Sequence, residues 1–374
     1  MIVEQIILKN AEGISALGKI EFSVDLMIIF MSPGFENKAG TLKEIHKKFP
    51  DATLIGCSTA GEICDVNVFD DTASITAVHF DKIKHRLAVV EVNDMQESFN
   101  AGSALAQQLD EDGLKHMLVL SDGLNVNGAD LVSGLKSKLP NVSITGGLAG
   151  DGSDFNETFV IHNDALSDKI IVGVGLYGDD LKVGYSSKGG WDSFGVERLV
   201  TKSDSNILYE LDGLPALELY KSFLGEAAKD LPGSGLMFPL SMRDNDTSLP
   251  VVRTILAIDE DEQSLTFAGN IPEGSYVRLM KANVDRLING AEESARMALD
   301  NLNQHSELAI LISCVGRRLI LKQMVEEEVE VVRDTLGAKP VITGFYSYGE
   351  IAPFGEFSPC ELHNQTMTIT TLSE

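Results

Sequence analysis

The sequence has few cationic residues and no long apolar run. Its 374 residues include 30 Lys and Arg against 56 Asp and Glu, a formal charge of −26 at pH 7. A surface of that sign repels phosphate backbones and anionic headgroups, so we expect no nucleic-acid or membrane partner. The apolar run Leu26–Met31 is too short to span a bilayer. The first residues lack the basic region of a signal peptide, and we expect a cytoplasmic protein.

Cysteine is scarce as well, with 4 residues in the chain. Cys57, Cys64, Cys314 and Cys360 do not have the paired spacing of a zinc site. No His, Cys or acidic residues show a zinc or calcium spacing, so we expect no metal and no cofactor. Reduced thiols in the cytoplasm are the simplest account of the cysteines.

One glycine pattern resembles a dinucleotide site without its required context. The segment Gly173–Gly178 matches G-x-G-x-x-G, but Asp179 and Asp180 follow it. A dinucleotide site needs a helix there, with its N-terminus on the pyrophosphate. The alternating residues after Asp180 favour a strand–turn–strand instead.

An internal repeat is the most informative feature. Three segments share an apolar strand, a loop, a helix, a second strand, and a glycine-framed turn that ends in a carboxylate. The expected strands are 26–31 and 52–55, 117–120 and 142–144, and 308–312 and 341–342. The expected helices are 42–49, 129–139 and a long one ending at 336, and the turns are 56–63, 146–151 and 344–351. Such alternation predicts parallel crossovers, which bind ligands at the carboxyl ends of their strands.

Alternating strands lie between these units. We expect strands at 73–79 and 86–92, a meander at 158–163, 170–177 and 181–186, and another at 251–258, 265–268 and 276–279. Helices are expected near 99–109 and at 284–302. The fold class is therefore mixed α/β (α+β), with repeated βαβ-type units and additional antiparallel strands. Turn residues near 205–215 favour two domains, 1–210 and 211–374.

The first and third turns have the outer spacing of a P-loop, but Glu62 and Glu350 replace its lysine. A carboxylate there repels a triphosphate, which argues against nucleotide hydrolysis. Backbone N–H groups with the hydroxyls of Ser58 and Thr59 could instead hold a ligand carboxylate, while a glutamate accepts from its ammonium. The alternative is that the glycines only make tight turns and the glutamates pair internally. Both interpretations stay open.

Several short strings, taken in order, resemble the FIST family. They are 54–63, 146–152, 190–191, 206, 208–212, 238–240, 252–253, 271–274, 344–351 and 362–366. The resemblance covers roughly residues 24 to 372 and implies a FIST N-terminal and a FIST C-terminal domain. It implies an intracellular sensory pair in signal transduction that binds a small ligand such as an amino acid, acting through a separate signalling output protein. It implies no oligomeric state and transfers no catalytic residues.

The motifs mark candidate ligand-binding positions. These are Gly56, Cys57, Ser58, Thr59, Gly61, Glu62, Gly146, Gly147, Asp151, Arg253, Tyr346, Tyr348, Glu350 and Asn364. Arg253 is a candidate counter-charge for a ligand carboxylate, with an internal salt bridge as the alternative.

Two other functions stay open beside sensing. One is an enzyme that uses Cys57 as a nucleophile or the carboxylates of Glu62 and Glu350 in acid–base chemistry. A cysteine nucleophile needs a partner base, and a small buried cysteine is the commoner case. The other is a pure protein-interaction module. We favour the sensor, and a protein without catalytic residues.

Overall fold

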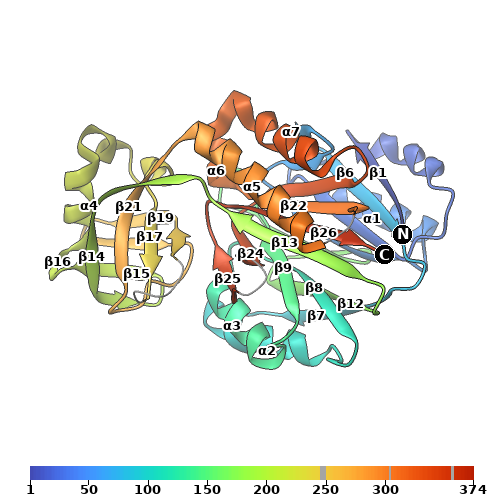
Figure 1. Ribbon diagram of the computed structural model, residues 1–374, viewed down its shortest axis with the longest axis horizontal. Coiled ribbons are helices and arrows are strands. Elements are labelled where there is room, and N and C mark those ends of the chain that lie inside the picture. Colours follow the sequence, from blue (N-terminus) through green and yellow to red (C-terminus); the bar gives the residue numbers. More distant parts are fainter. Residues whose placement is uncertain (245–249, 303–304, 355–357) are drawn as a thin grey trace.

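The computed structural model describes residues 1–244, 250–302, 305–354 and 358–374. These residues form two lobes (Figure 1). The larger one, called the body, contains three sheets, and the smaller one, called the small lobe, contains a fourth sheet and comprises residues 191–244 and 250–282. The small lobe is inserted between β13 (Lys182–Lys188) and α5 (Val284–Leu302). Both chain ends lie at the side of the body far from the small lobe (Figure 1).

Each sheet of the body is built on one parallel βαβ unit, which confirms the predicted repeat. The units are β2 (Leu26–Met31), α1 (Lys38–Lys48) and β3 (Thr53–Ser58); β8 (Leu114–Ser121), α3 (Gly128–Lys138) and β9 (Ser143–Leu148); and β22 (Leu308–Cys314), α6 (Val315–Leu321), α7 (Val325–Leu336) and β23 (Val341–Ser347). The long helix expected in the third unit is interrupted at Lys322, whose φ of 53° lies outside the helical region.

The three sheets have the same construction. Their strand orders are β1-β6-β2-β3-β10-β11, β7-β12-β8-β9-β24-β25 and β13-β26-β22-β23-β4-β5. Two antiparallel strands flank the first strand of each unit: β1 (Ile2–Leu8) and β6 (Ala73–His79), β7 (Lys84–Glu91) and β12 (Ile170–Tyr177), and β13 and β26 (Met367–Ser373). A hairpin flanks the second: β10 (Val160–His162) and β11 (Ala165–Ser167), β24 (Gly349–Pro353) and β25 (Cys360–His363), and β4 (Glu62–Cys64) and β5 (Asn67–Phe69).

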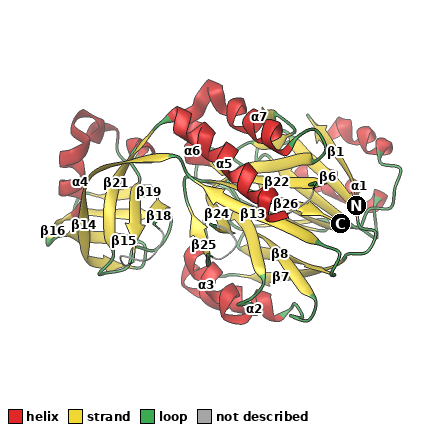
Figure 2. Ribbon diagram, viewed as in Figure 1, coloured by secondary structure: helices red, strands yellow, loops and turns green. Residues whose placement is uncertain are grey.

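Each hairpin joins the sheet of another unit. The β4–β5 hairpin follows β3 in the chain but pairs with β23, β10–β11 follows β9 but pairs with β3, and β24–β25 follows β23 but pairs with β9. Each of the three units thus gives one hairpin to another sheet and receives one in return, so the exchange forms a closed cycle. Apolar side chains from all three sheets meet in one core, among them Ile28, Leu118 and Ile310. The helices, including α2 (Ser98–Gln107), lie around the outside of the sheets (Figure 2).

The expected meander over residues 158–186 is wrong. Its strands belong to three different sheets, since β10 and β11 lie beside β3, β12 lies between β7 and β8, and β13 pairs with β26. An alternating pattern indicates a strand with two unlike faces but does not select its partner, which depends on long-range packing. The G-x-G-x-x-G segment lies in β12 and the turn after it, as a strand–turn–strand.

The small lobe is an antiparallel sheet covered by one short helix, α4 (Ala216–Leu224). Its strands are β14 (Trp191–Asp204), β15 (Ile207–Leu211), β16 (Leu214–Pro215), β17 (Leu240–Arg243), β18 (Val251–Arg253), β19 (Ile255–Asp259), β20 (Ser264–Phe267) and β21 (Tyr276–Ala282). The boundary expected after residue 210 lies within β15 of this lobe. Leu208, Tyr220 and Phe267 form part of its separate core.

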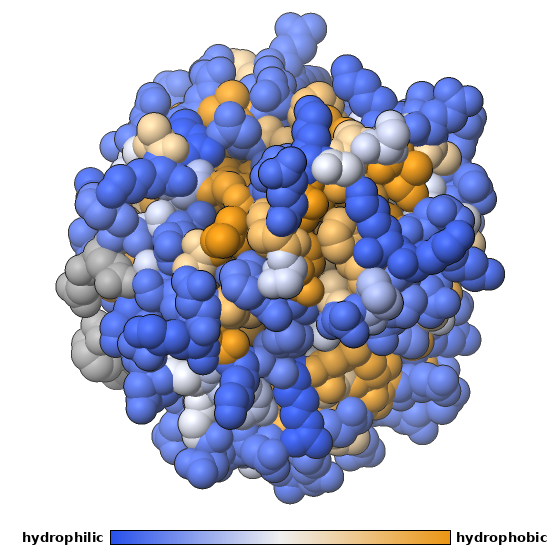
Figure 3. Space-filling view, turned by 90° about the vertical axis from the view of Figure 1, so that its right-hand side faces the viewer, coloured by the Kyte–Doolittle hydropathy of each residue, from blue (hydrophilic) through white to orange (hydrophobic). Residues whose placement is uncertain are grey.

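The two chain ends meet at one side of the body. The N-terminal ammonium lies 3.3 Å from the carboxylate of Glu374, beside a groove of about 540 Å³. Figure 3 views this side, where apolar side chains show among hydrophilic ones. Among the residues that the structure describes, no helix is both long and apolar enough to cross a membrane.

Candidate functional site

The three glycine-framed turns contact one another through a ring of backbone hydrogen bonds. Gly150 N donates to Ser58 O at 3.0 Å, Tyr348 N to Leu148 O at 3.2 Å, and Ala60 N to Tyr346 O at 2.8 Å. Each bond runs from one turn to the next at equivalent positions. The turns expected at the edges of separate units are therefore brought together.

The first glycine of each turn is required by packing. A Cβ on Gly56, Gly146 or Gly344 would lie 1.9 Å from a carbonyl oxygen of the neighbouring parallel strand. Gly147 is confined as well, because its Cβ would lie 2.7 Å from the Ile312 side chain. Gly61 has φ +129°, which disfavours other residues. Close strand packing and backbone conformation account for these glycines without a ligand.

The two turn glutamates are fully buried and bonded in the same way. Glu62 accepts from the Thr59 hydroxyl and from the Thr72 hydroxyl (2.6 Å) and backbone N (3.2 Å). Glu350 accepts from the Ser347 hydroxyl (2.6 Å) and from the Thr366 hydroxyl (2.8 Å) and backbone N (3.2 Å). Burial raises the pKa of Glu62 to about 7 and that of Glu350 to about 8. Both carboxyl groups are therefore paired internally.

Asp151 is not the structural counterpart of these glutamates. In the strand ladders, Glu62 and Glu350 each lie opposite the residue that follows the first glycine of a neighbouring turn. In the remaining turn that residue is Cys57, and it lies opposite Val160 rather than Asp151. Asp151 instead holds the following loop, accepting from the backbone N of residues 155 (3.0 Å), 156 (2.7 Å) and 157 (2.7 Å). The Tyr348 hydroxyl also donates to it. Asp151, which ends the shorter second turn, therefore stabilises a loop and does not take the place of the glutamates.

The hydroxyl and thiol groups of the first turn lie inside the protein. Cys57 is fully buried, and burial raises the pKa of its thiol well above the usual value, the opposite of what a thiolate nucleophile needs. Ser58 Oγ accepts from Phe159 N at 3.1 Å, and Thr59 bonds to Glu62. The two hydroxyl groups therefore have internal partners, and the thiol is enclosed in the protein.

Tyr346 belongs to a buried ionic network. Its hydroxyl donates to Glu328 Oε1 at 2.7 Å, and Arg317 Nη2 lies 2.7 Å from Glu328 Oε2, with both charged side chains fully buried. Arg317 also donates to Gly189 O (2.9 Å) and Leu287 O (2.8 Å). The chain passes from the body to the small lobe near Gly189 and returns to the body near Leu287; we call these two places the chain crossings. Arg317 is therefore hydrogen-bonded to the backbone at both crossings.

Arg253 links the lobes through backbone groups. It lies in β18 and donates to Asn270 O (3.2 Å), Val252 O (3.4 Å) and Leu362 O (2.9 Å), the last in β25 of the body. Burial lowers its pKa to about 10. Among the described residues, the hydrogen-bond acceptors of Arg253 are carbonyl oxygens rather than the carboxylate of an internal salt bridge. Its role as a counter-charge for a ligand stays a prediction.

Asn364 is fully buried beside the third turn. Neither its Oδ1 nor its Nδ2 has a hydrogen-bond partner among the residues described. Its Nδ2 lies 3.6 Å from the position of a Cβ on Gly349. Buried polar atoms are nearly always paired, so this amide is a potential contact for a small polar molecule.

A cavity of about 110 Å³ lies between the lobes, lined in part by residues of the second and third turns. The body contributes Leu148, Tyr348, Phe155, Met95, Gly123, Leu124, Val126 and Asn127, and the small lobe contributes Asn206, Leu256, Phe267, Ala268 and Gly269. Phe155 and Tyr348 stack, with ring centroids 4.6 Å apart and planes 13° apart. We call this cavity the interlobe cleft.

Of the candidate residues named from the sequence, only Tyr348 lines the interlobe cleft. The remaining candidates lie in the turns or near them and do not line this cleft, and their part in ligand binding stays a prediction. The sequence contained one unused signal, an aromatic residue, Phe155, in the polar segment that follows the second turn. Its pairing with Tyr348 depends on the hairpin exchange, which the sequence pattern does not show.

Comparison with known proteins identifies both halves of the chain. A family model described as the FIST N domain matches residues 25–214, and one described as the FIST C domain matches residues 216–353. Uncharacterized protein MJ1623 of Methanocaldococcus jannaschii is 25% identical over 333 residues, covering 80% of this chain and 62% of its own length. Uncharacterized protein Rv0628c of Mycobacterium tuberculosis is 24% identical over 250 residues, covering 63% of each. The chain thus spans less than two thirds of these relatives.

The solved structures found are remote. Cyanuric acid hydrolase from A. caulinodans aligns over 100% of this chain and 99% of its own, at 7% identity with a TM-score of 0.37. A second cyanuric acid hydrolase aligns with the same coverage and identity and a TM-score of 0.33. Similarity this low supports no conclusion about activity.

Proposed function

The chain belongs to the FIST family, whose domains are generally sensory domains of signal transduction, and we propose that it senses a small molecule bound in the interlobe cleft. The supporting observation is the composition of the cleft walls, which come from both lobes. Ligand sites occur preferentially at such domain interfaces. A molecule that contacts both walls would bias the orientation of one lobe relative to the other.

The lining favours a neutral ligand with a flat apolar part. Stacked Phe155 and Tyr348 offer aromatic surface, and Phe267 lies on the facing wall. The polar side chains of the lining are amides, Asn127 and Asn206. Both also have internal partners, since Asn127 accepts from two backbone N–H groups of α3 and donates to Asn270, and Asn206 donates to Phe267 O. No Lys, Arg, Asp or Glu lines the cleft within the described ranges. A neutral amide or heterocycle therefore suits it better than a zwitterionic amino acid, which the family resemblance implies as a further candidate.

The chain crossings offer a route for the signal. Gly190 has φ +137°, and a Cβ there would lie 2.2 Å from Arg286 O in the other crossing. Arg317 holds both crossings, and its partner Glu328 accepts from Tyr346 in the third turn. A ligand that contacts Tyr348 in the same turn would thus be linked to the crossings through Tyr346, Glu328 and Arg317. A separate signalling protein would read the resulting lobe orientation.

A thermal-shift screen tests the proposal. The library should contain small neutral amides and heterocycles, the amino acids, and organic acids. A ligand that binds only the native state raises Tm in a concentration-dependent way. We expect shifts from neutral planar compounds. Shifts from amino acids alone would favour a site at the turn glutamates Glu62 and Glu350 instead of the interlobe cleft. The absence of any shift would favour a pure interaction module.

A further inference from the structure

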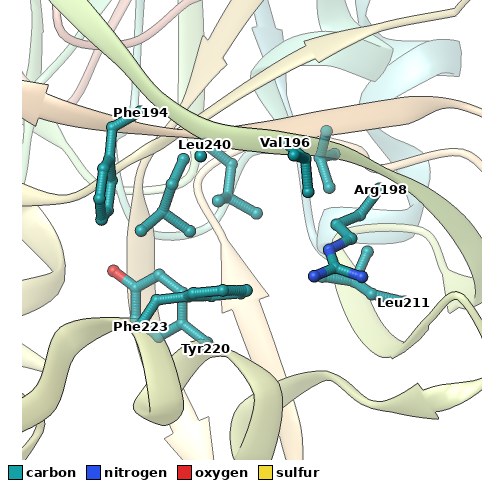
Figure 4. Close-up of a pocket in the computed structure, with 10 residues that line it drawn as sticks. Phe194, Val196, Arg198, Leu211, Tyr220, Phe223 and Leu240 are labelled. Atoms are coloured by element: carbon teal, nitrogen blue, oxygen red, sulfur yellow. The ribbon is translucent and has the colours of Figure 1, made fainter.

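The small lobe contains a second pocket, of about 60 Å³, between β14 and α4 (Figure 4). Its walls include Leu240, Val277 and Leu279 from the sheet and Tyr220 and Phe223 from α4. The Tyr220 hydroxyl is already bonded to Phe238 O at 2.7 Å. The walls offer apolar and aromatic surface almost throughout.

A bulge in β14 forms one side of this pocket. Phe194 pairs with Leu279 and Arg198 pairs with Val277, so residues 195–197 lie opposite the single residue Arg278. Gly195 has φ +77°, and nothing lies within 4 Å of its Cβ position. Bulges of this kind re-aim side chains and are frequent beside functional sites. Here Phe194, Val196 and Arg198 all line the pocket.

The rim of the pocket exposes large apolar side chains. Val196 is 63% exposed, Phe194 39% and Phe223 38%. They surround an opening rather than being scattered singly over the surface (Figure 4). An apolar opening with a single charged side chain is typical of a small-molecule site.

Arg198 supplies that charge at one end of the pocket, with Phe194 at the other (Figure 4). Its Nη1 lies 3.0 Å from Asp212 Oδ2, and its guanidinium lies 5.6 Å from the centre of the Phe223 ring. Its Nε is buried and has no partner in the part of the chain that is described. The pair with Asp212 uses Nη1, so Nε and Nη2 form the guanidinium edge that this pair does not occupy. That edge matches the two oxygens of a carboxylate.

We propose that this pocket binds a compact apolar monocarboxylate, a branched short-chain or small aromatic acid, with its apolar part between β14 and α4 and its carboxylate on the Nε–Nη2 edge of Arg198. The volume sets the size of the apolar part. A cavity of roughly 150 Å³ accepts benzene, so this pocket holds a smaller group or a ring that extends through the open rim. Asp212 neutralises part of the charge of Arg198, which keeps the affinity modest.

This proposal does not rest on the interlobe cleft, because the two cavities share no lining residue. Ligand-observed NMR titration of the full chain tests it, with isovalerate and benzoate as probes and benzyl alcohol as the uncharged control. Arg198→Gln removes the carboxylate partner. Val196→Glu places a like charge on an exposed rim position, so it does not depend on how the core tolerates a change. Arg286→Gln, at a 62% exposed arginine paired with Asp192, is the matched control.

We expect saturable binding of at least one acid, weakened about tenfold or more by Arg198→Gln and Val196→Glu and unchanged by Arg286→Gln. Benzyl alcohol should bind more weakly than benzoate to the wild-type chain and equally to Arg198→Gln. The proposal is overturned if neither acid saturates, if Arg198→Gln and Val196→Glu both bind the acids as the wild type does, or if benzyl alcohol matches benzoate.

Discussion

Two buried glutamates in the turns make the stability of the protein depend on pH. Glu62 and Glu350 each receive two hydroxyl donors and one backbone donor, yet burial outweighs these bonds and raises the pKa of both carboxyls. A carboxyl group with a raised folded-state pKa makes the native state bind more protons than the unfolded chain. The contribution of such a group to the free energy of unfolding is therefore fully present below its unfolded-state pKa, and it is lost as the pH rises through the folded-state pKa.

Replacing Glu350 by Gln should remove part of this pH dependence. The wild-type chain should lose up to about 1.4 kcal/mol per pH unit from this one group as the pH rises from near 4.5 towards its folded pKa of about 8. Gln keeps the shape and can bond to Ser347 and Thr366 without a charge. Unfolding free energies in urea between pH 5 and 8.5 measure the effect, and parallel curves for wild type and Glu350→Gln would contradict it.

The Arg317–Glu328 pair should be far more sensitive to substitution than a surface pair. Glu328→Gln leaves the Arg317 charge buried without its counter-ion, which should cost about 3 kcal/mol. Lys82→Met, which breaks a pair to Asp180 whose side chains are 65% and 56% exposed, is the control and should cost less than about 1 kcal/mol. Denaturant midpoints measure both, and comparable losses would count against the buried network.

At the scale of elements, periodicity and turn residues predicted much of the fold. The strand Leu26–Met31 and the helix Val284–Leu302 match the expected bounds, because a continuous apolar run and a helical stripe are local signals. Strand partners were not predictable. The β4–β5 hairpin lies beside β23 because long-range packing places it there, and no residue of the hairpin specifies that distant strand.

The equivalent glycines allow a test of the repeated packing. Gly344→Ala places a Cβ against the Leu311 carbonyl, which belongs to rigid backbone, and should destabilise the chain by roughly 2–3 kcal/mol. Gly18→Ala is the control, since the nearest atom to its Cβ position is the mobile Lys48 Nζ at 3.9 Å. Thermal unfolding measures both. A Gly344→Ala protein as stable as the wild type would mean that the strands do not approach as closely as described.

At the scale of the whole molecule, the exchange of hairpins brings the three turns together, and the inserted small lobe supplies one wall of the interlobe cleft. The sequence predicted a ligand held by the backbone N–H groups, hydroxyls and glutamates of the turns, with internal pairing of these groups as the alternative. Glu62 and Glu350 are buried and hydrogen-bonded internally. The interlobe cleft takes its walls from residues such as Phe155 and Phe267, more than 100 positions apart. Such a wall has no local signature in the sequence.

The most direct test of the account is calorimetric titration of the strongest ligand from the thermal-shift screen. Ala268→Phe fills the interlobe cleft from the small lobe, while Ala257→Phe adds the same ring at an exposed position of that lobe that does not line the cleft. We expect Ala268→Phe to abolish binding or weaken it by a factor of ten or more, because the ring occupies the ligand's place. Ala257→Phe should bind as the wild type does. Unchanged binding by Ala268→Phe would contradict the placement of the ligand between the lobes.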